Sequence, residues 1–270
     1  MVKTVIQVWT HIVKNLQTDT YNNFWGLGDI IRGTIKLHQL SKKLGFELLV
    51  DIQHHPVSAY LKPQMHKYYD LIKQNKYNIE FVFPNNTEQY INNNSDNTDD
   101  PDNVIYFITN DGYRTIEEPL TEECKNFMKN ILTPNEEFEK YLTEMTQTIS
   151  HTDYNILHYR LGDDSLVRNV QNSFPELKDS VIKNMEENDI LMSDNALFKS
   201  EIQKELPVFI FNIIPTHMGY TGDESLIKDS LFEFFVISGA TKIKTHSVYT
   251  HISGFVYWSH MIYDIPLHKI

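Results

Sequence analysis

The fold can be inferred from one segment of the sequence, residues 29–51, which is DIIRGTIKLHQLSKKLGFELLVD. Its apolar positions recur at alternating steps of three and four, the spacing of one buried helical face, and they are Ile30, Gly33, Leu37, Leu40 and Leu44. Gly45 favours the end of this helix, and Phe46–Asp51 is a short apolar run typical of a strand. With a first strand predicted at Val5–Trp9, the order strand–helix–strand predicts a parallel sheet covered by helices.

The second half of the sequence repeats this alternation of strands and helices. The predicted strands are Asn155–Arg160, Asp189–Asp194, Val208–Ile213 and one that begins with Ile243–Thr245, and the predicted helices begin near Ala196, Ser225 and Ser253. Two helices at Leu120–Leu132 and Glu136–Ile149, separated by Pro134, predict a linker between the halves. We therefore expect an α/β protein with two Rossmann-like lobes facing each other, residues 1–149 with the helical linker and residues 150–270.

The stretch from Asn85 to Asn103 differs in composition from the segments around it. Asn, Asp and Thr dominate it, and two predicted strands, Glu80–Phe83 and Val104–Thr109, flank it. Such a polar composition is typical of a surface loop. We expect a loop here, and we interpret its acidic cluster, Asp99-Asp100-Pro101-Asp102, as solvated surface rather than as a metal site.

Composition and charge exclude several classes of protein. The 270 residues carry a formal net charge of -12, which argues against a nucleic-acid partner because phosphate backbones require a basic surface. The single cysteine, Cys124, excludes an intrachain disulfide and favours a reducing compartment. No stretch approaches the roughly 18 apolar residues of a membrane span. We therefore expect a cytoplasmic protein without a membrane span.

Polar side chains follow three predicted strands of the second half. In open parallel sheets, ligands bind just beyond the carboxyl ends of the strands. The residues at these ends are His158, Arg160 and Asp163; Ser193 and Asp194; and Thr245, His246 and Ser247. We expect these side chains to converge on one cleft.

The first of these strand ends has the most specific chemistry. Because side chains alternate along a strand, His158 and Arg160 share one face and Tyr159 points to the other. A guanidinium offers forked donors to phosphate oxygens, which suits a phosphorylated ligand. Gly162 allows a sharp turn, and Asp163 could orient Arg160 or act as an acid or base. The alternative is a surface Arg–Asp pair that follows a core strand.

The segment His158-Tyr159-Arg160-Leu161-Gly162-Asp163 resembles a motif of a known family. This is the His-x-Arg-Arg-x-Asp motif of the α1,2-, α1,6- and protein-O-fucosyltransferases. In that family the first arginine contacts the diphosphate of GDP-fucose, and the histidine lies by the nucleoside. His158, Arg160 and Asp163 match the motif, and Leu161 stands in place of the second arginine.

The resemblance continues over most of residues 150–263. Ser193-Asp194 is similar to the end of a family strand, and Glu233 with Thr245-His246-Ser247 resembles the third family motif. The resemblance implies that Glu233 approaches the nucleotide base and that Ser247 binds phosphate. Ser247 also precedes the helix predicted near Ser253, whose amino end favours an anion. The alternative for Ser247 is an ordinary helix-capping region.

A glycine-containing segment in the first half, Gly26-Leu27-Gly28-Asp29, offers a possible counterpart. It lacks the Gly-Lys-Ser/Thr of a P-loop and the glycine spacing of a dinucleotide site, so a tight turn explains it as well. It nevertheless resembles the Gly-x-Gly segment that opens the first lobe of fucosyltransferases and nodulation-type transferases. On that resemblance Gly26, Gly28 and Asp29 are candidate substrate-binding residues.

Neither a metal nor a cofactor is expected. His54 and His55 are adjacent and would point opposite ways on a strand, and the sequence has no His-Glu-x-x-His pattern. Arg160 and Ser247 would stabilise the leaving diphosphate in place of a metal. The family resemblance implies a GDP-sugar as the donor substrate, with GDP-fucose as the specific expectation, and we expect it to bind without metal.

The family resemblance implies the GT-B-like arrangement, with the donor in the C-terminal lobe and the acceptor at the N-terminal lobe. The reaction would displace GDP from the anomeric carbon of the sugar by a hydroxyl of a glycan or protein acceptor. Asp163 or Asp164 would take the proton of that hydroxyl. Two alternatives remain, a catalytically weakened module that binds a nucleotide or glycan, suggested by Leu161, and a small-molecule hydrolase.

Overall fold

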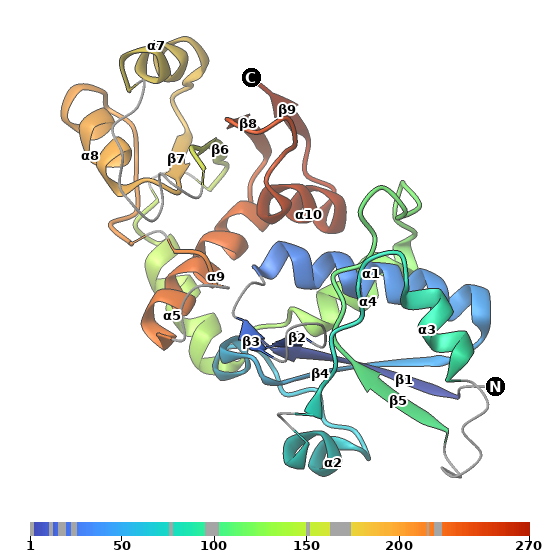
Figure 1. The fold of residues 1–270 in the computed structure, drawn as a ribbon. Coiled ribbons are helices and arrows are strands. Elements are labelled where there is room, and N and C mark those ends of the chain that lie inside the picture. Colours follow the sequence, from blue (N-terminus) through green and yellow to red (C-terminus); the bar gives the residue numbers. More distant parts are fainter. Residues whose placement is uncertain are drawn as a thin grey trace. The chain divides into compact units, whose positions relative to one another are not determined.

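The computed structural model describes residues 3–10, 13–15, 20–22, 26–75, 78–94, 103–149, 152–162, 174–214, 216–218 and 223–270. The chain forms two compact units (Figure 1). The first unit comprises Met1–Asn135 and Met218–Glu224, and the second comprises Glu136–His217 and Ser225–Ile270. The second unit therefore begins with α5 (Glu136–Thr146), which the sequence analysis assigned to the helical linker of the first lobe.

The first unit is built on a three-stranded parallel sheet. Its order is β4 (Glu47–His54), β1 (Thr4–Thr10), β5 (Val104–Phe107). The helix predicted from the opening segment is α1 (Leu27–Leu44), and it ends at Gly45 in the left-handed conformation. The predicted strand–helix–strand order and the parallel pairing are confirmed.

The remaining elements of the first unit are short. They are the antiparallel pair β2 (Val13–Asn15) and β3 (Thr20–Asn22), the 3-10 helix η1 (Pro56–Ala59), and the helices α2 (Tyr69–Gln74), α3 (Thr87–Asn93) and α4 (Glu122–Ile131).

Two predictions for the first unit are wrong in part. The segment predicted as strand Glu80–Phe83 forms bridges at Glu80 and Phe81, the latter with Ile108, instead of a continuous strand, and Pro84 follows closely. The stretch predicted as a loop contains α3, because Ile91 is buried in the core and the Tyr90 ring packs against Phe107 with centroids 5.1 Å apart. Tertiary burial thus orders part of an asparagine-rich segment that composition alone assigns to a loop.

Close packing of α1 against the sheet depends on Gly33. A Cβ atom at this position would lie 2.0 Å from the carbonyl oxygen of Thr109, which follows β5. The same carbonyl accepts a hydrogen bond from Nε2 of the buried Gln7 at 3.1 Å. Gly33 therefore lets the helix backbone approach the chain just beyond the carboxyl end of β5, beside Gln7 in the middle of β1.

The second unit contains a four-stranded sheet, again with all neighbours parallel. Its order is β7 (Asp189–Ser193), β6 (Asn155–Arg160), β8 (Lys242–Ser247), β9 (Leu267–Lys269). The helices described besides α5 are α7 (Phe174–Asn184), α8 (Ala196–Glu205), α9 (Glu224–Ser238) and α10 (Gly254–Tyr263). The α/β class with parallel sheets is therefore confirmed.

The strand predicted at Val208–Ile213 is wrong in extent. It pairs with β7 only through a bridge between Phe209 and Ile190. The residues after Phe209 are held by side chains of α8 and α9 instead of by a neighbouring strand: Lys199 binds the carbonyl of Ile213, and Ser230 binds the carbonyl of Thr216. Sequence patterning cannot distinguish such a side-chain-bound segment from a paired strand.

One face of this sheet forms a core with α7 and α8. Leu157 and Tyr159 of β6 pack there with Val181 and Phe198, and all four side chains are buried. Because alternate residues of a strand point to opposite faces, His158 and Arg160 point to the other face. The period-two prediction for β6 is therefore confirmed.

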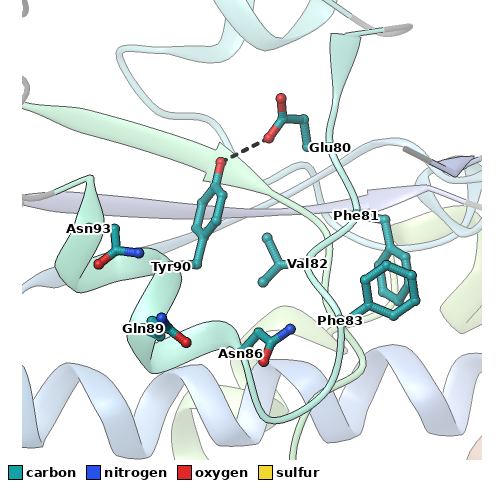
Figure 2. Close-up of a pocket in the computed structure, with 8 residues that line it drawn as sticks. All are labelled: Glu80, Phe81, Val82, Phe83, Asn86, Gln89, Tyr90 and Asn93. Atoms are coloured by element: carbon teal, nitrogen blue, oxygen red, sulfur yellow. Dashed lines mark hydrogen bonds between the residues drawn. The ribbon is translucent and has the colours of Figure 1, made fainter. Parts of the chain in front are cut away.

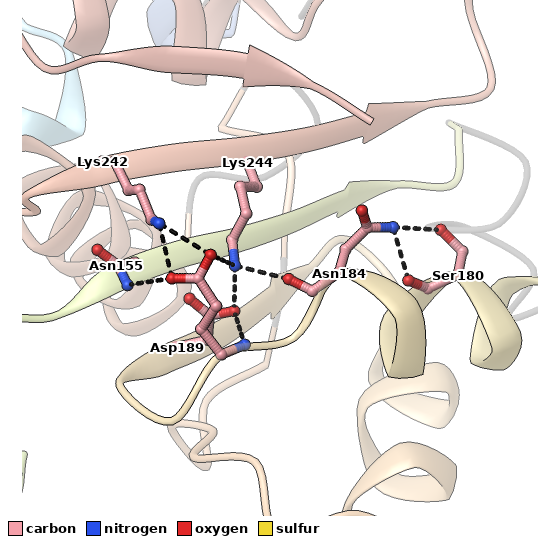
Figure 3. Close-up of polar contacts among 7 residues, drawn as sticks. Asn155, Ser180, Asn184, Asp189, Lys242 and Lys244 are labelled. Carbon is pink, nitrogen blue, oxygen red and sulfur yellow. Dashed lines mark hydrogen bonds and ion pairs between the residues drawn. The ribbon is translucent and has the colours of Figure 1, made fainter.

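A buried ion pair joins the amino ends of β7 and β8 (Figure 3). Lys244 Nζ donates to Asp189 Oδ2 at 2.6 Å and to the carbonyl of Asn184 at 2.6 Å. The Lys244 and Asp189 side chains are 8% and 0% exposed. Two residues earlier on β8, Lys242 pairs with Glu186 at 2.6 Å, with side chains 31% and 50% exposed.

Replacing Lys244 and Lys242 one at a time compares how much a buried and a more exposed ion pair contribute to the free energy of unfolding. Lys244→Met should lower the free energy of unfolding by about 3–5 kcal/mol, because it leaves the Asp189 carboxylate buried without its cation. Lys242→Met, on the same face of the same strand, should cost at most about 1 kcal/mol. Urea unfolding monitored by hydrogen exchange in β6 measures both. Equal effects of the two changes would contradict the assignment of Lys244 as the buried partner.

Candidate functional site

The carboxyl ends of β7, β6 and β8 bring most of the predicted site residues to one edge of the second sheet. The register places His158 beside Thr245 and Arg160 beside Ser247. Since these positions share their parity along paired strands, all four side chains project from the same face. His158 also lies beside Met192 of β7, so Ser193 and the residue after it reach the same edge.

His158 is a buried, neutral member of this face. Its Nδ1 lies 3.0 Å from Oγ1 of the buried Thr245. Burial, reinforced by the nearby charges of Arg160 and His246, lowers the pKa of His158 to about 3. The imidazole therefore binds as a neutral donor and acceptor at physiological pH, and the fixed positive charge here belongs to Arg160.

Asp194 orients Arg160 and the backbone that follows it. Asp194 Oδ2 accepts from Arg160 Nη1 at 2.6 Å and from the amide of Gly162 at 3.0 Å, and Oδ1 accepts from the amide of Leu161 at 2.7 Å. Burial raises the pKa of Asp194, while Arg160 and the two amides act to lower it. One carboxylate thus fixes both the guanidinium and the turn that follows β6.

The turn itself requires glycine at position 162. Its φ is +101°, and a Cβ atom there would lie 3.2 Å from the Tyr249 hydroxyl and 3.3 Å from a Val248 methyl. The amide of Val248 donates to the carbonyl of Arg160 at 3.0 Å, which prolongs the pairing of β6 with β8 past Ser247. Gly162 therefore folds the chain back close beside the segment that follows β8.

Two predicted site residues make local contacts. Ser193 Oγ accepts from the amide of Asn195 at 3.2 Å, and Asn195 Oδ1 caps α8 by accepting from the amide of Phe198 at 2.8 Å. Ser247 Oγ accepts from the amide of Tyr249 at 3.2 Å. The cap was missed by the sequence analysis, although an asparagine before a helical run is its usual signal.

His246 lies on the opposite face of the sheet from Arg160. Its ring stacks on Tyr159 with centroids 5.4 Å apart and planes inclined by 30°. The Tyr159 hydroxyl contacts Ser180 Oγ at 2.9 Å on the α7 side. Of the residues predicted from the third motif, Thr245 and Ser247 therefore share the face of Arg160, and His246 does not.

An acidic side chain and a buried lysine also form a pair in the second unit. Glu233 of α9 lies 3.8 Å from Nζ of Lys199 of α8, and both side chains are largely buried. Burial raises the pKa of Glu233 to about 6; Lys199 acts to lower it, and Asp229 and Asp194 raise it further. Lys199 was not predicted. The sequence feature that could have indicated it is a lysine at a buried position of α8, beside Phe198.

The other predicted site residues fall outside the described residues or belong to the first unit. Asp163 and Asp164 fall outside the described residues. Gly26 caps the amino end of α1 in the first unit, where its carbonyl accepts from the amide of Asp29, and Gly28 lies in the first turn of that helix. Asp29 pairs with Arg32 at 3.1 Å, and Arg32 Nε donates to the carbonyl of Asn110 at 2.8 Å.

The candidate metal ligands among the described residues make other contacts. Within the described residues no three His, Cys, Asp or Glu side chains are grouped to hold an ion. His54 Nε2 contacts the carbonyl of Ile72, and His55 Nδ1 accepts from the amide of Val57. The acidic cluster at residues 99–102 falls outside the described ranges. None of the helices described is long and apolar enough to cross a membrane.

A surface pocket of about 260 Å³ lies in the first unit between α3 and residues 80–83 (Figure 2). Tyr90 reaches across it and donates to Glu80 Oε2 at 3.1 Å. Asn86, Gln89 and Asn93 line it from α3. None of the predicted site residues lines this pocket.

Comparison with known proteins supports the fold through structure alone. No protein-family model and no curated protein matches the sequence. Among solved structures, fucosyltransferase NodZ from Bradyrhizobium superposes with a TM-score of 0.54 at 12% identity, over 96% of this chain and 92% of that one. A variant of Arabidopsis thaliana FUT1 in complex with GDP gives a TM-score of 0.53 at 12% identity, over 100% and 70% of the chains.

POFUT1 in complex with GDP is similar over nearly the full length of both chains. It gives a TM-score of 0.50 at 9% identity and covers 99% of this chain and 98% of that one. A NodZ α-1,6-fucosyltransferase structure soaked with GDP-fucose gives a TM-score of 0.54 at 12% identity. The chain therefore has a fucosyltransferase-like α/β fold with parallel sheets, of the GT-B-like kind.

Proposed function

We propose that this protein is a glycosyltransferase that binds a GDP-sugar at the carboxyl ends of β6, β7 and β8. One observation carries the proposal: Arg160 is held by Asp194 at a strand end, on the same face as His158 and Ser247, in a fucosyltransferase-like fold. Ligands of open parallel sheets bind at this edge. The ion pair that the structure describes, Arg160 with Asp194, is largely buried, with side chains 16% and 9% exposed. The alternative of a surface pair of Arg160 with Asp163 stays a prediction, because Asp163 lies outside the described residues.

The diphosphate of the donor would lie against Arg160. Because Asp194 already fixes the guanidinium, little side-chain freedom is lost when phosphate binds. Ser247 lies beside Arg160 in the register, and its hydroxyl can donate to a phosphate oxygen. As the bond from the anomeric carbon to the phosphate oxygen breaks, GDP departs with the electron pair, and these preorganised donors stabilise its growing charge.

The guanine base would lie toward Glu233. A carboxylate repels phosphate but accepts hydrogen bonds, and guanine presents two neighbouring donors, N1–H and the N2 amino group, that match its two oxygens. With the pKa of Glu233 raised to about 6, the carboxyl is mostly ionised at neutral pH. These features support a guanine nucleotide over an adenine one.

The transferred sugar and its acceptor complete the proposal. We take fucose as the sugar, supported by the structural likeness to NodZ soaked with GDP-fucose. A hydroxyl of a glycan or protein acceptor would attack the anomeric carbon, and Asp163 or Asp164 would take its proton. Arg160 supplies the positive charge that a metal ion supplies in other transferases, so we propose that the reaction needs no metal.

A second candidate function follows from Leu161. In the described structure its side chain packs against the core formed with α7 and α8. It therefore offers no donor at the position where the resembling motif has a second arginine. A module that binds GDP-sugar with little or no transfer is the function this observation favours. GDP binding without measurable release of GDP from GDP-fucose would identify it.

Arg160→Ala tests the diphosphate contact. The contact strengthens as the leaving group gains charge, so the change should lower the rate of GDP release from GDP-fucose by about 100-fold or more and weaken GDP binding. Arg160→Lys should recover only part of both, because an ammonium keeps the charge without the fork. Lys204→Ala, an exposed charge change on α8, is the control. Full activity and full GDP affinity in Arg160→Ala would exclude the proposed site.

Treatment with EDTA tests metal independence. Activity on GDP-fucose should be unchanged by the chelator and by later addition of Mn²⁺ or Mg²⁺, because Arg160 and Ser247 provide the electrostatic stabilisation. The measurement is the initial rate of GDP release before and after chelation. Loss of activity that either metal restores would contradict this proposal and would direct attention to the acidic cluster at residues 99–102.

A further inference from the structure

Lys199 of α8 and Glu233 of α9 form a pair inside the second unit, where both side chains are largely buried. Lys199 Nζ donates to the carbonyl of Ile213 at 3.1 Å and lies 3.8 Å from Glu233 Oε1. A buried ammonium is costly unless it is paired and hydrogen-bonded, and Lys199 has both kinds of partner. Its position is therefore fixed by two contacts on two different segments.

Two acidic groups among the described residues also act on the pKa of Glu233. Asp229 precedes Glu233 by one turn of α9, and Asp194 follows β7; both raise its pKa, as burial does. Lys199 of α8 is the group that lowers it. Its positive charge therefore opposes the burial and the two carboxylates that favour the protonated form.

Lys199 also links Glu233 to the segment that runs beside α9. The amide of Ile214 donates to Asp229, and Ser230 Oγ donates to the carbonyl of Thr216 at 3.2 Å. Lys199 binds the carbonyl of Ile213, which precedes Ile214 in the chain. The ammonium of Lys199 thus attaches α8 to the chain at Ile213 and also attracts the carboxylate of Glu233. The side chain of the next residue, Ile214, is 63% exposed.

We propose that Lys199 is a positioning residue for the donor base, which acts by fixing the orientation and charge of the Glu233 carboxylate. The inference rests on the proposed function, since it assigns Lys199 to the guanine end of that site. Lys199 acts through Glu233 and does not itself contact the nucleotide. It therefore governs which base is accepted and at what pH, and leaves the diphosphate contact of Arg160 unaffected.

Guanine binding requires the ionised carboxylate of Glu233, and this requirement sets the direction in which GDP affinity changes with pH. Glu233 is ionised above its pKa of about 6 and protonated below it, so GDP affinity should fall as the pH drops through about 6. Without Lys199 this pKa rises, and the loss of affinity should move to higher pH. Adenine lacks paired N–H donors on the corresponding edge, so ADP binding should change little.

Three variants and a control test this role by titration calorimetry with GDP and ADP across the pH range. Lys199→Met should weaken GDP binding at least about tenfold at neutral pH, the size expected for charge-assisted hydrogen bonds, and leave ADP binding unchanged. Lys199→Gln keeps a donor for the Ile213 carbonyl without the charge, so it should fold and show the same loss. Lys199→Arg should restore most of the affinity. Lys204→Met, an exposed change on the same helix, should bind as the wild type does.

A carboxyl ¹³C NMR titration of the nucleotide-free protein provides a second readout, with Glu233→Gln to assign the signal. The midpoint for Glu233 should rise in Lys199→Met and Lys199→Gln relative to the wild type. An unchanged midpoint, or unchanged GDP affinity and pH profile in both variants, would overturn the role of Lys199. If the wild type binds no GDP at all, the proposed function fails, and the NMR titration alone then decides whether Lys199 sets the charge of Glu233.

Discussion

The arrangement of the candidate site depends on the contact of Asp194 with Arg160. One buried carboxylate holds the guanidinium and also the two backbone amides of Leu161 and Gly162. A carboxylate that accepts three such bonds fixes both a side chain and the path of the chain beyond the strand. The contact joins the end of β6 to the turn after β7, and all the proposed phosphate chemistry is built on the geometry it imposes.

Buried charged side chains are arranged differently at the amino ends and at the carboxyl ends of β6 and its neighbouring strands. At the amino ends, Lys244 and Asp189 pair with each other inside the protein. At the carboxyl ends, Arg160, Asp194, Lys199 and Glu233 form pairs whose acidic members have raised pKa values. Perturbed carboxyl groups near strand ends are typical of functional sites, whereas a closed pair at the other end is typical of structural support. This difference, together with the fold, supports placing a nucleotide at the carboxyl edge.

Much of the fold was predictable from the sequence because it rests on periodic burial. The α1 stripe, its end at Gly45 and the alternation along β6 all follow from repeats that a single sequence displays. Helix α3 and the residues after Phe209 were mispredicted, because contacts of Ile91 with the core and of Lys199 with the Ile213 carbonyl determine them. In the site, strand-end position predicted the shared face of His158, Arg160, Thr245 and Ser247. The same alternation places His246 on the other face, so its predicted convergence with Thr245 and Ser247 was wrong on spacing alone. The role of Lys199 depends on side-chain contacts that spacing does not encode.

Hydrogen exchange of the wild-type protein, with and without GDP, tests the central claim most directly. The account predicts that GDP slows exchange in residues 155–162, at the carboxyl end of β8 and in α9 around Glu233. Exchange in the first unit, including the helix α1 that begins after Gly26, would then change less. GDP that binds without protecting the end of β6 or β8, or that protects only the first unit, would contradict a nucleotide site centred on Arg160.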